Sequence, residues 1–213
     1  NLHKDVKAAY EQNFSDYKDT VPQLFYHNAM VILGNGVDAK LGSLSSKYEH
    51  FNDWKRLHEE EPGVVAMETL LKVVCNKTNL LDLFENYTIF DDSSGRLIKI
   101  VARNHQFLGV NRAVEAVRNR ESLDGKLGVF WHTQGSGKSY SIAFFAKKVH
   151  RKLGGNFTFI VLTDREDLDS QIYKTFAGIG LVDHDRDPCR ASSGKHLESL
   201  LGQHKSYIFS LIH

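Results

Sequence analysis

The sequence has 213 residues, of which 41% are hydrophobic and 25% charged, a composition typical of globular proteins that excludes a disordered chain. The formal net charge of +1 excludes a strongly basic or acidic tail, although residues 1–100 carry an acidic excess and residues 101–213 a basic one. Cys75 and Cys189 stand apart and the histidines lack metal-ligand spacing, so we expect neither a disulfide framework nor a zinc site. A reducing cytoplasm is the expected setting, and no stretch predicts a membrane span.

The first hundred residues predict a small α+β region. Val6, Tyr10 and Phe14 recur at helical spacing in a helix expected from Leu2 to Tyr17, which ends before Pro22. The next elements are strands at 30–33 and 37–41 around Gly34-Asn35-Gly36, helices at 48–57, 64–76 and 79–86, and a hairpin of 87–90 with 97–101.

Strands and helices alternate in the second part of the sequence, residues 101–213. The expected elements are a helix at 105–118, a strand at 128–132, a helix at 138–153, a strand at 157–163, a helix at 166–176 and a strand at 206–212. Alternation of this kind predicts a parallel sheet covered by helices. The expected fold class is therefore α/β, with a partial parallel sheet in residues 101–213 that follows the α+β region of residues 1–100.

The segment from His132 to Ser139, His-Thr-Gln-Gly-Ser-Gly-Lys-Ser, has the composition of a phosphate-binding loop between a strand and a helix. Gly135 and Gly137 can take positive φ, so that backbone N–H groups close around phosphate oxygens at the helix N-terminus. Lys138 would neutralise the β- and γ-phosphates, and the Ser139 hydroxyl would hold Mg²⁺. The expected nucleotide-binding residues of this loop are Thr133, Gln134, Gly135, Ser136, Gly137, Lys138 and Ser139.

The loop departs from the usual P-loop pattern at one position, and it also has an alternative interpretation. His132 occupies the position where the usual P-loop pattern has its first glycine. A glycine- and serine-rich surface loop before a basic helix is the structural alternative. The strand and helix expected on either side favour the nucleotide site.

Arg103 and Gln106 open the helix that precedes the loop. A glutamine amide can donate to adenine N7 and accept from the N6 amino group at once, so Gln106 is suited to reading adenine, with Arg103 close to the phosphates or the ring. An ordinary solvated helix start is the alternative for such a short motif. Its distance in sequence from the phosphate loop favours the adenine role.

The segment from Thr163 to Gln171 follows an expected parallel strand, at the sheet edge where ligands gather in α/β proteins. Thr163 or Asp164 can cap the helix that begins there, and its acidic first turn suits the helix dipole. Arg165 and Gln171 are not explained in this way. Contact with a nucleic-acid backbone and simple solvation both stay open for these two residues.

Together, the runs 103–106, 128–139 and 163–171 resemble the motor (restriction) subunit of type I restriction-modification enzymes, and Trp-His-Thr before the glycines and Thr-Asp-Arg-x-x-Leu-Asp-x-Gln are its most particular motifs. Segments within residues 17–55 resemble the part of that subunit that joins nuclease to motor. The resemblance implies paired RecA-like lobes of helicase superfamily 2 that use ATP and Mg²⁺ to translocate double-stranded DNA. It also implies a separate PD-(D/E)xK nuclease domain and, as partners, the methylation and specificity subunits.

The same resemblance implies roles for particular residues. Lys138 and Ser139 match the catalytic end of the ATP motif, Arg103 and Gln106 match the adenine motif, and Arg165 and Gln171 fall in a segment that we treat as a candidate DNA contact. No counterpart of the nuclease carboxylates or of the DEAD-type box occurs in the sequence. The 213-residue chain alone is therefore expected neither to hydrolyse ATP nor to cut DNA.

Two other classes of protein remain possible at this stage. A different superfamily 2 helicase or a type III restriction subunit would share the phosphate loop but not Trp131-His132 or the 17–55 segment. A non-catalytic module would use residues 1–100 to dock partner subunits and carry a vestigial loop. Nucleotide binding separates the non-catalytic module from the enzymes.

Overall fold

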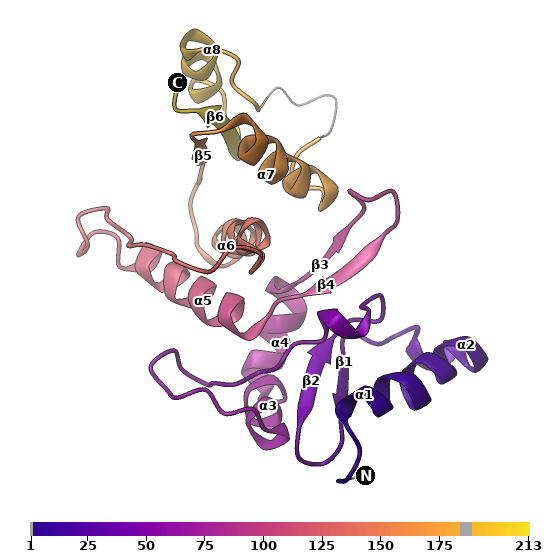
Figure 1. The fold of residues 1–213 in the computed structure, drawn as a ribbon. Coiled ribbons are helices and arrows are strands. Elements are labelled where there is room, and N and C mark those ends of the chain that lie inside the picture. Colours follow the sequence, from indigo (N-terminus) through magenta and orange to yellow (C-terminus); the bar gives the residue numbers. More distant parts are fainter. Residues whose placement is uncertain (1, 184–188) are drawn as a thin grey trace. The chain divides into compact units, whose positions relative to one another are not determined.

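The structure is a computed structural model that describes residues 2–183 and 189–213 (Figure 1). The chain forms two compact units that interleave in sequence. Unit 1 comprises Asn1–Ile89 and Ile98–Asn111, and unit 2 comprises Phe90–Leu97 and Arg112–His213. Each unit is described by itself. The elements confirm the expected mixed α/β character.

The N-terminal helical stretch of unit 1 confirms the first predicted helix. It consists of α1 (Val6–Ala9), a π-helical turn (Tyr10–Ser15) and α2 (Asp16–Thr20), followed by a 3₁₀ turn at Pro22–Phe25. The Asp5 carboxylate caps the start by accepting from the Lys7 N–H at 2.6 Å. Val6 and Phe14 pack with Leu33 and Phe51 in a buried cluster.

The predicted hairpin that follows is also confirmed. Strands β1 (Val31–Gly34) and β2 (Ala39–Gly42) pair antiparallel, with Val31 opposite Gly42 and Gly34 opposite Ala39. Asn35 fixes the turn because its side-chain oxygen accepts from the N–H groups of Val37 and Asp38 at 2.9 and 2.8 Å. Gly36 has a φ of +104°, a conformation that only glycine adopts readily.

The helix predicted at 48–57 is wrong. Only Tyr48–His50 forms a 3₁₀ turn, and the chain then runs extended beside β2. Asn52 exchanges two backbone hydrogen bonds with Leu41, at 2.8 and 2.9 Å, and this pairing overrides the helical spacing of the apolar residues. The extended course buries Phe51 and Trp54.

The other predicted helices and the second hairpin are present, with bounds that differ from the predicted ones by one to three residues. They are α3 (Met67–Val74), α4 (Lys77–Asn86), β3 (Thr88–Asp91), β4 (Ile98–Val101) and the start of α5 (Asn104–Arg118). The Asn76 side chain caps α4 by accepting from the N–H groups of Thr78 and Asn79. Strands β3 and β4 pair in a two-stranded sheet.

Unit 2 contains a small parallel sheet with helices on it. Its further elements are α6 (Lys138–Lys152), β5 (Phe159–Thr163), α7 (Glu166–Gly178), α8 (Gly194–Leu201) and β6 (Tyr207–Leu211). Strand β5 pairs parallel with β6, from Phe159 opposite Tyr207 to Thr163 opposite Leu211. Arg190 makes a parallel bridge to Phe209 and so extends the sheet beyond β6.

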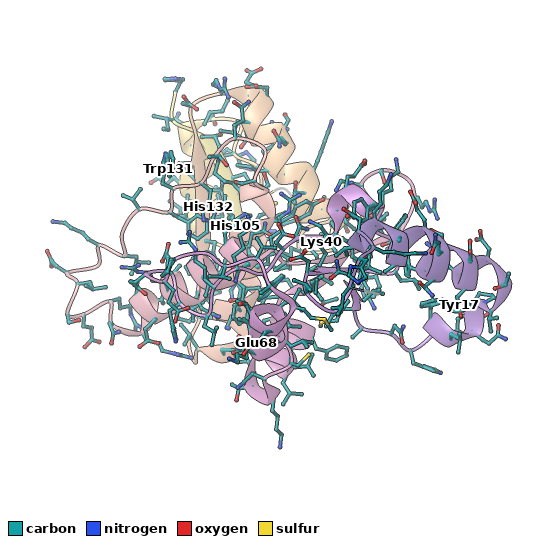
Figure 2. All side chains as sticks on the ribbon, turned by 60° about the horizontal axis from the view of Figure 1, so that its bottom comes forward. Tyr17, Lys40, Glu68, His105, Trp131 and His132 are labelled. Atoms are coloured by element: carbon teal, nitrogen blue, oxygen red, sulfur yellow. The ribbon has the colours of Figure 1, made fainter. Side chains whose placement is uncertain are left out.

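The strand predicted at Gly128–His132 is absent from the described structure. The segment leads into α6 without strand pairing among the described residues, and its apolar side chains face solvent, with Val129 94% and Trp131 79% exposed (Figure 2). An apolar run forms a buried strand only where neighbouring strands and helices cover it. In the part of the chain that the structure describes, the parallel sheet contains β5, β6 and the bridge at Arg190, and none of these pairs with the segment.

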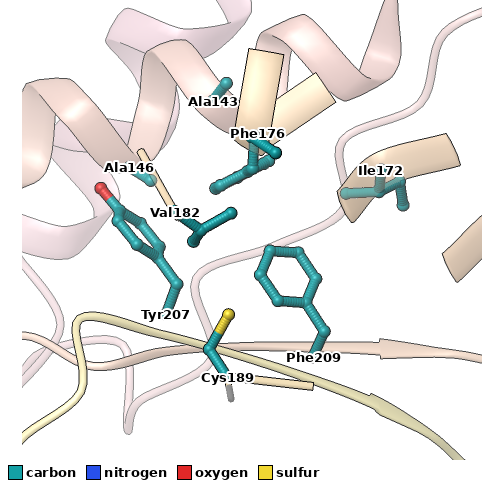
Figure 3. Close-up of a cluster of buried hydrophobic side chains, with 9 residues drawn as sticks. Ala143, Ala146, Ile172, Phe176, Val182, Cys189, Tyr207 and Phe209 are labelled. Carbon is teal, nitrogen blue, oxygen red and sulfur yellow. The ribbon is translucent and has the colours of Figure 1, made fainter. Parts of the chain in front are cut away.

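The core of unit 2 lies between the sheet and the helices α6 and α7. Phe176 on α7 makes edge contacts with Tyr207 and Phe209 on β6, with ring centroids 5.3 Å apart in both cases (Figure 3). Ala143 and Ala146 are the residues that α6 contributes to the same buried cluster. Their small side chains allow α6 to approach the rings closely. Burial raises the pKa of Tyr207 to about 12.

Replacement of Phe176 tests this core. Phe176→Ala removes a fully buried ring and is expected to lower the free energy of unfolding by about 3–5 kcal/mol. Phe84→Ala, at a position that is 61% exposed on α4, is the matched control and should change it by less than about 0.5 kcal/mol. Urea denaturation measures both. Equal effects of the two substitutions would contradict the packing of α7 on β6.

Candidate functional site: the phosphate loop and its flanking motifs

The predicted phosphate loop lies directly before α6. Gly135 and Gly137 have φ values of +77° and +87°, so both glycines take the left-handed conformation that the sequence predicts. Gly137 is the N-terminal cap residue of α6 and brings no side chain to the first-turn N–H groups. A helix start of this kind, at the positive end of the helix dipole, suits phosphate oxygens.

The Lys138 side chain folds back over the loop. Its ammonium group donates to the carbonyl oxygens of His132 and Thr133 at 2.9 and 3.0 Å. The Ser136 N–H donates to the same Thr133 carbonyl at 3.3 Å and closes the turn. An ammonium group has three donors, so Lys138 can exchange carbonyl oxygens for phosphate oxygens without leaving the loop.

The other loop residues differ in their exposure. Ser136 is buried, Ser139 is half-buried, and Thr133 and Gln134 are exposed. Ser139 is the second residue of α6, so its hydroxyl starts from the helix turn that carries the Lys138 ammonium. A hydroxyl beside an ammonium and a helix N-terminus can serve as a ligand of a Mg²⁺ ion that accompanies phosphate.

His132 packs against the residue two positions before it. The rings of Phe130 and His132 make an edge contact with centroids 4.4 Å apart. Trp131, between them, is largely exposed (Figure 2). This alternation is that of extended backbone. His132 therefore ends the extended segment as a ring that packs on its own chain.

The predicted adenine residues lie in unit 1, at the start of α5. The Gln106 side chain is 3% exposed, and its carbonyl oxygen accepts from the Arg103 N–H at 2.9 Å. Arg103 precedes the helix, so Gln106 acts as the third residue of a capping box. The structure thus gives Gln106 a local capping role at the helix start, but it buries the side chain and so differs from the solvated helix start that was the alternative, while Arg103 is half-buried.

Asn104 is a further residue at this helix start that the sequence motifs did not reveal. Its side-chain oxygen accepts from the N–H groups of Lys55 and Arg56 at 3.0 and 3.2 Å, and its amide donates to the Arg56 carbonyl at 3.1 Å. The partners lie 48 and 49 positions earlier in the chain. Asn104 therefore fixes the start of α5, and with it Gln106, to the extended segment after β2.

The segment from Thr163 to Gln171 leaves the end of β5 and enters α7 in unit 2. Thr163 is buried, whereas Arg165 and Gln171 are exposed, and the Arg165 guanidinium lies 3.7 Å from the Asp167 carboxylate. The expected cap at Thr163 or Asp164 is wrong. Arg165 is the cap residue, and no side chain makes a capping hydrogen bond there. The helix itself begins at Glu166, as predicted.

Residues 105–213, slightly more than half of the chain, match the family described as SWI2/SNF2 ATPase. The chain belongs to the SWI2/SNF2 ATPase family. It is also 36% identical over 211 residues to a type I restriction enzyme HindI endonuclease subunit from Haemophilus influenzae, with 94% of the chain covered. The sequence resemblance to type I restriction enzyme subunits is thereby confirmed.

Two further relatives carry similar names. A putative type I restriction enzyme endonuclease subunit from Methanocaldococcus jannaschii is 27% identical over 83% of the chain, and one from Staphylococcus aureus is 26% identical over 81%. The chain covers 20%, 19% and 18% of the length of the three relatives. It therefore spans about a fifth of the curated relatives that it matches. Among the described residues, no helix has the length and apolar character needed to cross a membrane.

Asp169 is a buried charge in the SWI2/SNF2 part of the chain, and the sequence motif that contains it indicated no role for it. Its carboxylate accepts from the Arg190 Nε at 2.5 Å and from the Thr163 hydroxyl at 3.4 Å, and only 2% of the side chain is exposed. Asp169 lies three residues before Ile172 and seven before Phe176, on the buried face of α7. This helical spacing marks Asp169 in the sequence as a residue of the buried face of α7. The carboxylate ties α7 to the end of β5 and to the Arg190 bridge.

Removal of this carboxylate should destabilise the chain. Asp169→Ala is expected to lower the free energy of unfolding by about 2 kcal/mol, a moderate value because the partner Arg190 is 44% exposed. Asp167→Ala is the control on the same helix, since that side chain is 76% exposed, and should cost less than about 0.5 kcal/mol. Chemical denaturation compares the two variants. An Asp169→Ala variant as stable as the control would contradict a stabilising role for the hydrogen bonds of the Asp169 carboxylate.

Proposed function

We propose that this chain is part of the subunit of a type I restriction endonuclease that translocates and cleaves double-stranded DNA at the expense of ATP. The observation that carries the proposal is the phosphate loop, in which two left-handed glycines and the Lys138 ammonium meet at a helix N-terminus. The SWI2/SNF2 ATPase match and the names of the relatives support it. Residues 101–213 would begin the first motor lobe, and residues 1–100 would join it to the nuclease.

In this proposal the loop binds the phosphates of ATP. Gly135 and Gly137 shape the backbone, the Lys138 ammonium moves from the loop carbonyls to the β- and γ-phosphates, and the Ser139 hydroxyl holds Mg²⁺. The residues present fit this ligand, because the loop offers an ammonium, a hydroxyl and a helix start within one turn. Bound Mg²⁺ would supply charge neutralisation at the phosphates.

The finer fold is part of the same proposal. Gly128–His132 would form a strand of a RecA-like sheet once neighbouring strands cover it. The exposed apolar side chains of this segment support this, and so do Ile160 and Leu162 on β5, which are 46% and 57% exposed. Apolar side chains of this extent at a sheet mark a surface that further structure covers.

The proposed partners follow from the resemblance. Double-stranded DNA would contact Arg165 and Gln171, whose exposure at the sheet edge leaves them accessible. The methylation and specificity subunits would complete the complex, and recognition of the DNA sequence would reside on the latter. A cytoplasmic location accords with an enzyme that acts on DNA inside the cell.

Loss of the loop ammonium tests the ATP site. In a complete subunit, Lys138→Ala is expected to abolish DNA-stimulated nucleotide hydrolysis, because no other group of the loop neutralises the transferred phosphate. Lys174→Ala, at an exposed position on α7, is the control and should leave hydrolysis near the wild-type rate. Phosphate release measures both. Hydrolysis at the wild-type rate in Lys138→Ala would refute the proposed function and favour a vestigial loop.

Two substitutions at Gln106 separate base recognition from helix capping. Gln106→Glu keeps an oxygen acceptor for the Arg103 N–H but loses the amide donor, so it should keep the helix cap, melt somewhat earlier because a charge is buried, and lose the preference for ATP over GTP. Gln106→Ala should lose both the cap and the preference. Nucleotide competition and thermal melting give the two readouts. An unchanged base preference in Gln106→Glu would show that capping is the whole role of Gln106.

A further inference from the structure

The turn between β3 and β4 contributes a buried carboxylate to unit 2. Asp91 is 1% exposed. One of its oxygens accepts from the Ser93 N–H at 2.8 Å, and the other accepts from the Tyr140 hydroxyl. Asp91 comes 47 residues before Lys138 in the sequence, and no motif of the chain includes it. The carboxylate is therefore held by its own turn and aimed at α6.

Tyr140 connects this carboxylate to the phosphate loop. It is the third residue of α6 and follows Ser139 directly. Burial, together with the hydrogen bond to Asp91, raises the pKa of the Tyr140 hydroxyl well above its ordinary value. The hydroxyl is the donor of this hydrogen bond, and the Asp91 carboxylate is the acceptor.

The turn is also fixed from its other side, at the C-terminal end of α7 (Figure 1). The Asp92 N–H donates to the Gly178 carbonyl at 3.0 Å. A Cβ at Gly178 would lie 2.5 Å from the Asp91 carboxylate and 3.0 Å from the Ser93 nitrogen, so a side chain there would push the turn away. The absence of a side chain at Gly178 therefore lets the turn sit against α7 while Asp91 reaches Tyr140.

The first turn of α6 is hydrogen-bonded to the phosphate loop. The Lys138 ammonium binds the carbonyls of His132 and Thr133, and the Ser141 N–H donates to the Gly137 carbonyl at 3.1 Å. A displacement of Tyr140 would therefore shift the backbone N–H groups that face the phosphates. The hydrogen bond from Tyr140 to Asp91 opposes that displacement from outside the loop.

We propose that Asp91 is a positioning residue for the phosphate loop and acts through the Tyr140 hydroxyl, so that the β3–β4 turn sets the affinity for nucleotide. The inference rests on the proposed function, since it assigns the contact to the ATP site. The competing explanation is a purely structural tie, which would affect stability and leave the nucleotide affinity of the folded protein unchanged.

The experiment measures nucleotide affinity and stability separately in a complete subunit. Tyr140→Phe is expected to raise the Kd for Mg-ATP, and for a non-hydrolysable analogue, roughly five- to tenfold, the equivalent of about one hydrogen bond. Tyr173→Phe is the matched control. Its hydroxyl donates to the Asp183 carbonyl at 3.0 Å in the same unit, a contact that involves neither Asp91 nor the phosphate loop, so the Kd should not change.

A double-mutant cycle shows whether Asp91 acts through Tyr140. Asp91→Ala should weaken binding to the same extent as Tyr140→Phe, and the double variant should bind no more weakly than either single variant. A Tyr140→Phe variant that melts earlier but binds nucleotide like the wild type would overturn the inference and leave a structural tie. Lys138→Ala is included as the reference for the site itself. Equal binding by the wild type and Lys138→Ala would overturn the proposed function instead.

Discussion

Burial of α6 is the constraint on which the rest of unit 2 depends. Ala143, Phe144, Ala146 and Val149 are almost completely buried, so the rotation and position of the helix are set by packing. The phosphate loop is the direct continuation of that helix. Because the core fixes α6, the loop needs few contacts of its own, and two glycines with the folded-back Lys138 suffice to shape it.

Sequence patterns that span only a few residues predicted most of the helices and strands. The helices α5, α6 and α7 and the hairpin at Asn35-Gly36 follow from spacing and turn chemistry that act within a few residues. The failures depend on partners elsewhere in the chain. The helix predicted at 48–57 does not form, because Asn52 pairs with the backbone of Leu41. The run at 128–132 has the composition of a strand but has no strand beside it among the described residues.

The residues of the candidate site also differ in whether the sequence could reveal them. The loop glycines and Lys138 are recognisable because their roles are set by neighbours in sequence. The sequence did not reveal the polar contacts of Asp169 and Asp91, since their partners Arg190 and Tyr140 lie 21 and 49 positions away. Gln106 shows a third situation, in which one side chain suits two roles. The sequence motif suggests adenine, and the structure gives the same side chain a capping hydrogen bond.

Polar contacts connect both ends of α7 and the start of α6 to the rest of unit 2. Asp169 joins the first turns of α7 to the sheet, whereas the last turn of α7 meets the Asp92 N–H. α7 is thus fixed at both ends by polar contacts. α6 packs on the core through alanines and aromatic rings and, at its start, donates one side-chain hydrogen bond to Asp91. Apolar packing fixes where α6 lies, whereas a hydrogen bond also requires a particular direction between donor and acceptor. The hydrogen bond from the Tyr140 hydroxyl to Asp91 therefore adds a directional constraint at the end of α6 that carries the phosphate loop.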